Sequence, residues 1–167
     1  FTNISYKSLT GGPCGSCIYL PFLAPNINER RDIAIHFCIF INIESNGEGG
    51  AIYANCEVTG IQNNQFYNCR TSSENGNDQG GAIFLDAQSI CSQEYIAGCL
   101  FEDCSSTNSG GAIFANCVDL EENNRRSTRA NDNYQYAIMI DSCNFTRCHT
   151  KVRGGAISSG IQTEEIK

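Results

Sequence analysis

The sequence predicts an all-β chain folded as a parallel β-helix, a solenoid of about five coils with roughly 30 residues in each. Three observations predict this fold: a glycine motif that recurs along the chain, a phenylalanine motif that precedes each copy, and short β-branched or aromatic runs between turn residues. The length of 167 residues suits a single domain over 1–167.

The glycine motif reads Gly-Gly-Ala-Ile and ends in an aromatic residue or serine. Its copies begin at Gly49, Gly80, Gly110 and Gly154, with a degenerate copy at Gly15. The spacings between the first glycines are 34, 31, 30 and 44 residues. Stacked parallel strands tolerate such variation, because a corner can hold a loop of any length while neighbouring coils stay aligned.

The phenylalanine motif precedes every glycine motif and begins at Phe1, Phe40, Phe66, Phe101 and Phe145. The runs around both motifs lack the apolar spacing of an amphipathic helix. They are short, β-branched and bounded by Asn, Gly, Ser and Asp, as strands are, for example Gln65 to Cys69. We expect the phenylalanines to stack as an inward ladder.

Side-chain alternation assigns faces to the residues of the glycine motif. The isoleucine is the same in every copy, so it should face inward; these residues are Ile18, Ile52, Ile83, Ile113 and Ile157. The next position should face outward and form a contiguous aromatic contact stripe of Tyr19, Tyr53, Phe84 and Phe114. Such a stripe could stack on sugars or contact another subunit. The glycine pair should mark a corner that needs positive φ or close approach of adjacent coils.

The paired motifs resemble the repeat of the polymorphic outer membrane proteins of chlamydiae, and similar repeats occur in large surface proteins of other microbes and protists. The resemblance extends over nearly the whole chain, through short motifs only. It implies a right-handed β-helix displayed at a cell surface, often in adhesion. The sequence departs from the family's Phe-x-x-Asn motif, because Cys69, Cys104 and Cys148 stand in place of the asparagine.

Eleven cysteines are dense for a cytosolic protein and favour an extracellular one. Equivalent cysteines in adjacent coils would satisfy the Cα spacing of a disulfide, although their side chains start parallel. The candidate disulfide residues are Cys69, Cys104, Cys148, Cys99, Cys143, Cys14 and Cys17. The sequons at Asn3 and Asn144 are candidate N-glycosylation sites, which suits a secreted glycoprotein.

The polar segment 121–133 is predicted to be a loop insertion, either solvated or a protruding contact loop. Neither terminus resembles the cap that a solenoid needs, so we expect a segment of a longer protein. Its partners would be copies of itself, or further coils of the same chain, at the ends of the β-helix.

The function predicted from these features is structural: an extracellular β-helix scaffold of a cell-surface protein or filament. The scaffold could also be adhesive and bind host or matrix glycans or proteins. The first alternative is a carbohydrate-binding surface module, and the less favoured one is a pectate-lyase-like polysaccharide enzyme. The carboxylates do not gather at equivalent positions, so we expect no enzyme, no catalytic residues, no metal and no cofactor. The net charge of −7 argues against a nucleic-acid-binding protein. The longest apolar run is too short to span a membrane.

Overall fold

The structure is a computed structural model that describes residues 1–2, 5–6, 17–20, 33–55, 60–73, 76, 78–87, 94–117 and 138–159. Every regular element within these ranges is a β-strand. All strand pairs are parallel. The prediction of an all-β chain with parallel strands is therefore confirmed.

The strands form three sheets. Sheet A contains β1 (Ser5–Tyr6), β4 (Ile39–Ser45), β7 (Gln65–Thr71), β10 (Leu100–Glu102), β11 (Ser105–Ser106), β14 (Asn144–Thr146) and β15 (His149–Thr150). Sheet B contains β2 (Ile18–Leu20), β5 (Ile52–Ala54), β8 (Ile83–Ala87), β12 (Ile113–Cys117) and β16 (Ile157–Ser159). Sheet C contains β3 (Ala34–His36), β6 (Gly60–Gln62), β9 (Glu94–Ala97) and β13 (Ile138–Asp141).

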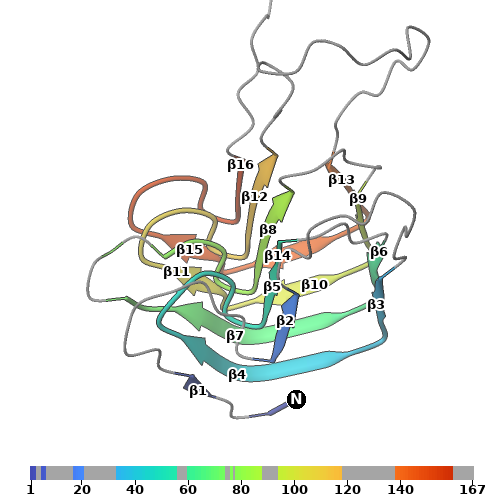
Figure 1. Cartoon of the computed structure of the whole chain (residues 1–167), viewed down its shortest axis with the longest axis horizontal. Helices are drawn as coiled ribbons and strands as arrows, with labels where there is room; N and C mark the ends of the chain where they lie inside the picture. Colours follow the sequence, from blue (N-terminus) through green and yellow to red (C-terminus); the bar gives the residue numbers. More distant parts are fainter. Residues whose placement is uncertain are drawn as a thin grey trace, which may run out of the picture.

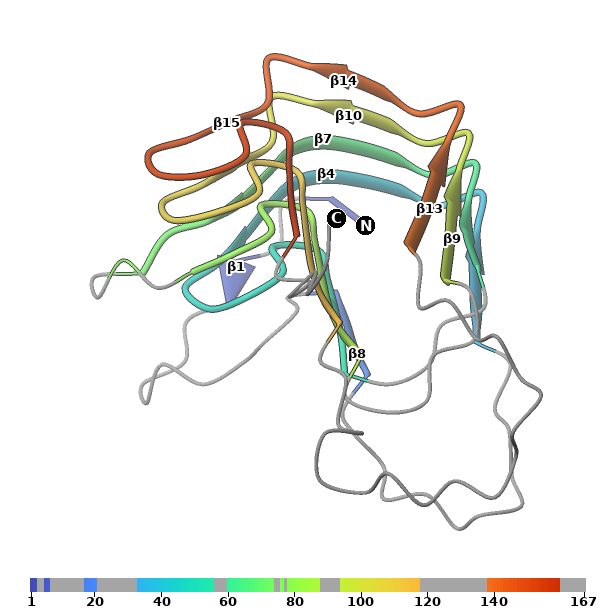
Figure 2. The same cartoon turned by 90° about the horizontal axis from the view of Figure 1, so that it is seen from above.

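The chain visits the sheets in the constant order C, A, B, and each visit adds a strand beside the equivalent strand of the previous passage. We call one passage a rung and number the rungs from the N-terminal side; rung 1 contributes β1 and β2, and rung 5 contributes β13 to β16. Figure 1 shows the rungs stacked in sequence order. Figure 2 shows the strands of sheet A side by side along the top of the view and those of sheet C on the right.

Two columns of apolar side chains fill the space between the sheets. In sheet B, Ile52, Ile83 and Ile113 are register partners and are fully buried. In sheet A, the rings of Phe40, Phe66, Phe101 and Phe145 stack with centroids 4.8 Å apart at each step. Both predicted inward columns are confirmed in rungs 2 to 4, whereas Phe1 in rung 1 and Ile157 in rung 5 are exposed. Their burial removes large apolar side chains from water, at about 25 cal/mol per Å².

The glycine pair forms the corner between sheets A and B, and its two members have different roles. The first glycine has a positive φ, +67° at Gly80 and +66° at Gly110, which a residue with a side chain adopts rarely. The second glycine lies against the next rung: a Cβ on Gly81 would be 2.1 Å from the carbonyl oxygen of Gly111. The predicted corner is therefore confirmed, and it uses both properties of glycine.

Candidate functional site

The predicted aromatic stripe forms a continuous stack on sheet B. Tyr19, Tyr53, Phe84 and Phe114 are register partners, and successive ring centroids are 5.2, 5.3 and 5.3 Å apart. Tyr19 is 48% exposed, but Tyr53, Phe84 and Phe114 are only 3%, 3% and 8% exposed. The prediction of an exposed contact stripe is wrong for these three residues, because alternation along a strand assigns a face without showing whether that face meets water.

Two carboxylates accompany this aromatic stack. Burial raises the pKa of Glu48 to about 7, and the negative charge of Asp86 adds to the rise. Asp86 accepts a hydrogen bond of 3.0 Å from the side-chain amide of Asn116 on β12. Burial also raises the pKa of Tyr53 to about 12. Glu48 therefore changes its charge near neutral pH, beside a buried aromatic column.

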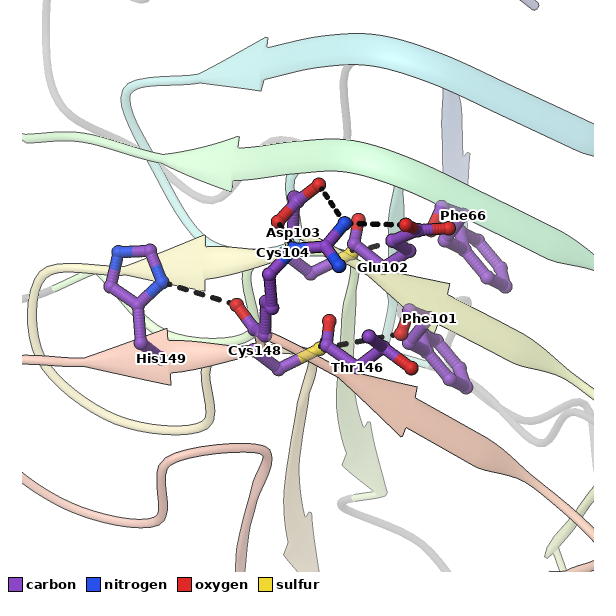
Figure 3. A network of polar contacts seen from close by, with 9 residues as sticks. Phe66, Phe101, Glu102, Asp103, Cys104, Thr146, Cys148 and His149 are labelled. Atoms are coloured by element: carbon purple, nitrogen blue, oxygen red, sulfur yellow. Dashed lines mark hydrogen bonds and ion pairs between the residues drawn. The ribbon is translucent and has the colours of Figure 1, made fainter.

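The cysteines whose side chains the structure describes are free thiols: Cys17, Cys38, Cys69, Cys99, Cys104, Cys143 and Cys148. This corrects the predicted disulfides, with the exception of Cys14, which lies outside the described residues. Six of these thiols, all except that of Cys17, donate to backbone carbonyl oxygens. The Cys104 Sγ, for example, donates to the oxygens of Phe66 and Glu102, both at 3.6 Å (Figure 3).

The thiols of successive rungs repeat the same arrangement. The Cys148 Sγ donates to the carbonyl oxygens of Phe101 at 3.6 Å and Thr146 at 3.7 Å (Figure 3). The side chains thus run parallel instead of facing one another, which is why the Cα spacing alone does not produce a bond. Burial raises the pKa of Cys17 and that of Cys99 to about 11, and the thiol of Cys104, together with burial, raises the pKa of Cys148.

Sheet A bends at one residue in each of rungs 2 to 5, and these residues have positive φ: Asn42 (55°), Asn68 (50°), Asp103 (55°) and Arg147 (52°). We call these four residues, together with Glu102, the polar corner. Asn and Asp tolerate this conformation better than other residues that carry a side chain, since their short polar side chains can bond locally. Asn68 Nδ2 donates to Asn42 Oδ1 at 2.8 Å and so links two rungs.

Rungs 4 and 5 are linked at the polar corner by Arg147. Its guanidinium donates to both carboxylate oxygens of Asp103, at 2.6 and 2.8 Å, and also to Glu102. Figure 3 shows Glu102 and Asp103 reaching the same guanidinium group. The hydrogen bonds from Arg147 lower the pKa of the Asp103 carboxyl. Because the side chains are exposed, such pairs order the surface more than they stabilise the fold.

A second ion pair joins rungs 2 and 3 farther along sheet A. Arg70 donates to Glu44 at 2.9 Å, and this contact lowers the pKa of Glu44. Within the described ranges, no group of three or more His, Cys, Asp and Glu side chains has the arrangement of a metal site. The same ranges contain no helix long and apolar enough to cross a bilayer.

Of the two candidate glycosylation sites and the predicted loop insertion, the structure describes only Asn144. Asn144 is exposed at the start of β14, and its glycosylation stays a prediction. Asn3 and the loop 121–133 lie outside the described residues.

The positive φ of the four residues of sheet A at the polar corner was not predicted from the sequence. A second set of positive-φ residues precedes sheet A at Phe37, Asn63, Gly98 and Ser142. Asn42, Asn63, Asn68 and Gly98 could have indicated these corners, because asparagine and glycine favour positive φ. Phe37, which has a φ of 55° and is 78% exposed, is of a residue type that gives no such indication.

The comparisons with known proteins give one match. The sequence model of the Chlamydia polymorphic membrane protein (Chlamydia_PMP) repeat matches residues 37–55, which extend from the corner before β4 to the residue after β5. No curated protein and no solved structure matches the chain. The match includes Phe40 and the Gly49-Gly50-Ala51-Ile52 motif. It supports, in general terms, a repeat of the kind found in surface proteins. Residues 37–55 are therefore similar to the Chlamydia polymorphic membrane protein (Chlamydia_PMP) repeat.

Proposed function

We propose that this chain is a right-handed parallel β-helix that serves as a rigid scaffold in a cell-surface protein or filament. The observation that carries the proposal is the register of the two core columns. Phenylalanine meets phenylalanine and isoleucine meets isoleucine at each step between rungs. A repeated rung buries its apolar side chains against identical neighbours, so the architecture supports length and stiffness.

The right hand of the β-helix is favoured by the parallel pairing. A connection that leaves a strand and returns to a parallel neighbour in the same sheet is right-handed in about 98% of cases. Each step from one strand of sheet A to the next is such a connection, made through sheets B and C.

A scaffold role fits the site better than a catalytic or sugar-binding role. The aromatic column that would have stacked on sugars is buried at Tyr53, Phe84 and Phe114. The charged side chains of the polar corner are bound to one another across rungs. The proposed adhesive surface is the exposed outer side of sheet A, which presents these ordered polar groups.

Surface labelling of cells that produce the chain tests the proposal. Antibodies against the purified chain should decorate intact cells in immunogold electron microscopy, and external protease should remove the label. An antibody to an intracellular protein is the control. Label that appears only after permeabilisation would contradict a surface scaffold. For adhesion, beads coated with the folded chain should bind host cells or matrix more than beads coated with heat-unfolded chain.

A further inference from the structure

The thiols of Cys69 and Cys104 are neighbours in the interior of the stack. The register pairs Arg70 with Ser105, so the residues that precede them, Cys69 and Cys104, lie beside each other in rungs 3 and 4. Both side chains are 0% exposed, and rungs 2 and 5 lie on either side of the pair. The Cys104 thiol interacts with that of Cys69. The core therefore contains a pair of sulfur ligands that the scaffold role does not use.

The two thiols point in the same direction, and this determines the distance between their sulfur atoms. The Sγ atom of Cys69 donates to the carbonyl oxygen of Phe40, one rung below, at 3.8 Å. The Sγ atom of Cys104 donates in the same way to the oxygen of Phe66, at 3.6 Å. Parallel side chains repeat at the spacing of their strands, and the stacked rings of Phe66 and Phe101 in the same two rungs are 4.8 Å apart. The sulfur atoms therefore lie at about the spacing of the strands.

A sulfur spacing of this size is too long for a disulfide but matches a linear sulfur–metal–sulfur unit. A disulfide joins sulfur atoms about 2.05 Å apart. Two metal–thiolate bonds of about 2.3 Å in one line bring the sulfur atoms about 4.6 Å apart. The parallel arrangement that leaves Cys69 and Cys104 unbonded to each other therefore places two ligands on opposite sides of a single metal ion.

The surroundings of the pair favour a soft ion of low coordination number. Thiol sulfur is a soft ligand of the kind that selects Cu(I). The side chains of Ile43, Phe66 and Phe101 belong to the same buried apolar cluster and offer no further ligand. A Zn²⁺ ion would need four ligands in a tetrahedron. Among the described residues, no group of three or more His, Cys, Asp and Glu side chains is arranged for such an ion.

We propose that Cys69 and Cys104 bind one Cu(I) ion between them in a linear, two-coordinate site. The ion replaces the proton of one thiol, which is released to solvent, and no electron is transferred. The second sulfur binds the ion through a lone pair and keeps its own proton. The occupied site is then electrically neutral, which suits it to the core, because an uncompensated charge there is costly. The site needs only the stacked rungs 3 and 4, and not the proposed location at a cell surface.

The amount of copper retained after refolding tests the site. Because the pair is buried, the chain is refolded from urea with Cu(I) and ascorbate in the absence of oxygen. A Cu(I) chelator, bathocuproine disulfonate, removes weakly bound copper, and gel filtration then isolates the folded chain. The ratio of copper to protein should be one ion lower in Cys69→Ser and in Cys104→Ser than in the unsubstituted chain. Cu(I) should also raise the melting temperature of the unsubstituted chain more than that of either variant.

Two more substitutions separate loss of a ligand from loss of folding, which circular dichroism monitors. Cys69→Val should fold, because Ile43 is its register partner in rung 2 and is equally buried, and it should lose the same copper ion. Cys38→Ser is the matched control: its neighbour in rung 3 is Asn64 and not a thiol, so its copper content should equal that of the unsubstituted chain.

Three results would overturn the site. The first is equal copper content in the unsubstituted chain and in folded Cys69→Val. The second is a loss of copper in Cys148→Ser that Cys69→Val does not show, because the ion would then lie between other sulfur atoms. The third is retention of Zn²⁺ that depends on Cys69 and Cys104 in the same way, because a linear pair does not provide the four ligands of zinc.

Discussion

The rings of Phe66 and Phe101 stack face to face across rungs 3 and 4, with centroids 4.8 Å apart and an angle of 2° between their planes. Both side chains are fully buried, and the same contact continues to Phe40 below. The ladder thus couples consecutive rungs through identical side chains, which makes each rung depend on its neighbours for burial.

Truncation of the ladder should destabilise the chain according to position. Phe101→Ala removes a fully buried ring and should lower the free energy of unfolding by about 3–5 kcal/mol. Phe145→Ala should lower the free energy of unfolding by less, because Phe145 is only half-buried. Urea denaturation followed by circular dichroism measures both, with Asn144→Ala as an exposed control expected within about 0.5 kcal/mol. Equal losses for Phe101→Ala and Asn144→Ala would contradict the ladder.

The isoleucine column offers a matched pair of charged substitutions. Ile113→Asp places a carboxylate among fully buried side chains and should lower the free energy of unfolding by at least about 3 kcal/mol. Ile157→Asp introduces the same group where the residue is 38% exposed, so its cost should be clearly smaller. Thermal melting followed by circular dichroism compares them. An Ile113→Asp variant that melts like the unsubstituted chain would refute the inward assignment.

Glu48 should make stability depend on pH near neutrality. Its pKa is about 7 in the folded chain and 4.5 when unperturbed, so folding favours the protonated carboxyl. The resulting stabilisation is complete below pH 4.5 and is lost as the pH rises through about 7. Because solvent screens this partly exposed carboxyl, its contribution to the free energy of unfolding is reduced to about 1 kcal/mol.

Urea denaturation of the unsubstituted chain and of Glu48→Gln, at about pH 5 and about pH 8, isolates this contribution. The variant should lose less stability between the two pH values. The prediction fails if both chains show the same change.

The thiol of Cys99 should react slowly in the folded chain. Burial raises its pKa from 9.0 to about 11, which lowers the thiolate fraction near pH 8 by about 100-fold. Alkylation followed by mass spectrometry should therefore give a rate at least about 100-fold below that of the urea-unfolded chain. Since the unfolded thiol ionises first, the free energy of unfolding should also fall as the pH rises above 9.0. Recovery of Cys99 in a disulfide-linked peptide would contradict the free thiol.

The repeats made the two inward columns predictable, because identical residues at fixed positions of each copy must meet when the copies stack. The same reasoning failed for Tyr53, Phe84 and Phe114, whose burial depends on what lies over sheet B and not on the strand itself. Equivalent cysteines do lie in adjacent rungs, as the spacing predicted. Disulfide formation also depends on the direction of the side chains, which the spacing does not encode.

The bends within sheet A were less predictable than the glycine corner between sheets A and B. Asn42, Asn68 and Asp103 are residue types that accept positive φ, yet Arg147 takes the equivalent place without any local preference for it. There the register of the stack determines the backbone, and the bond from Arg147 to Asp103 compensates part of the cost.

Contacts between isoleucine methyl groups test the central claim, in-register parallel rungs, most directly. Nuclear Overhauser spectroscopy of a chain with labelled isoleucine methyl groups, assigned by single Ile→Val substitutions, would record them. The account predicts contacts from Ile52 to Ile83 and from Ile83 to Ile113, because these residues are register partners in adjacent strands of sheet B. It predicts no contact from Ile52 to Ile113, which lie two strands, or roughly 10 Å, apart. A contact between Ile52 and Ile113, or the absence of both sequential contacts, would contradict the stacked rungs.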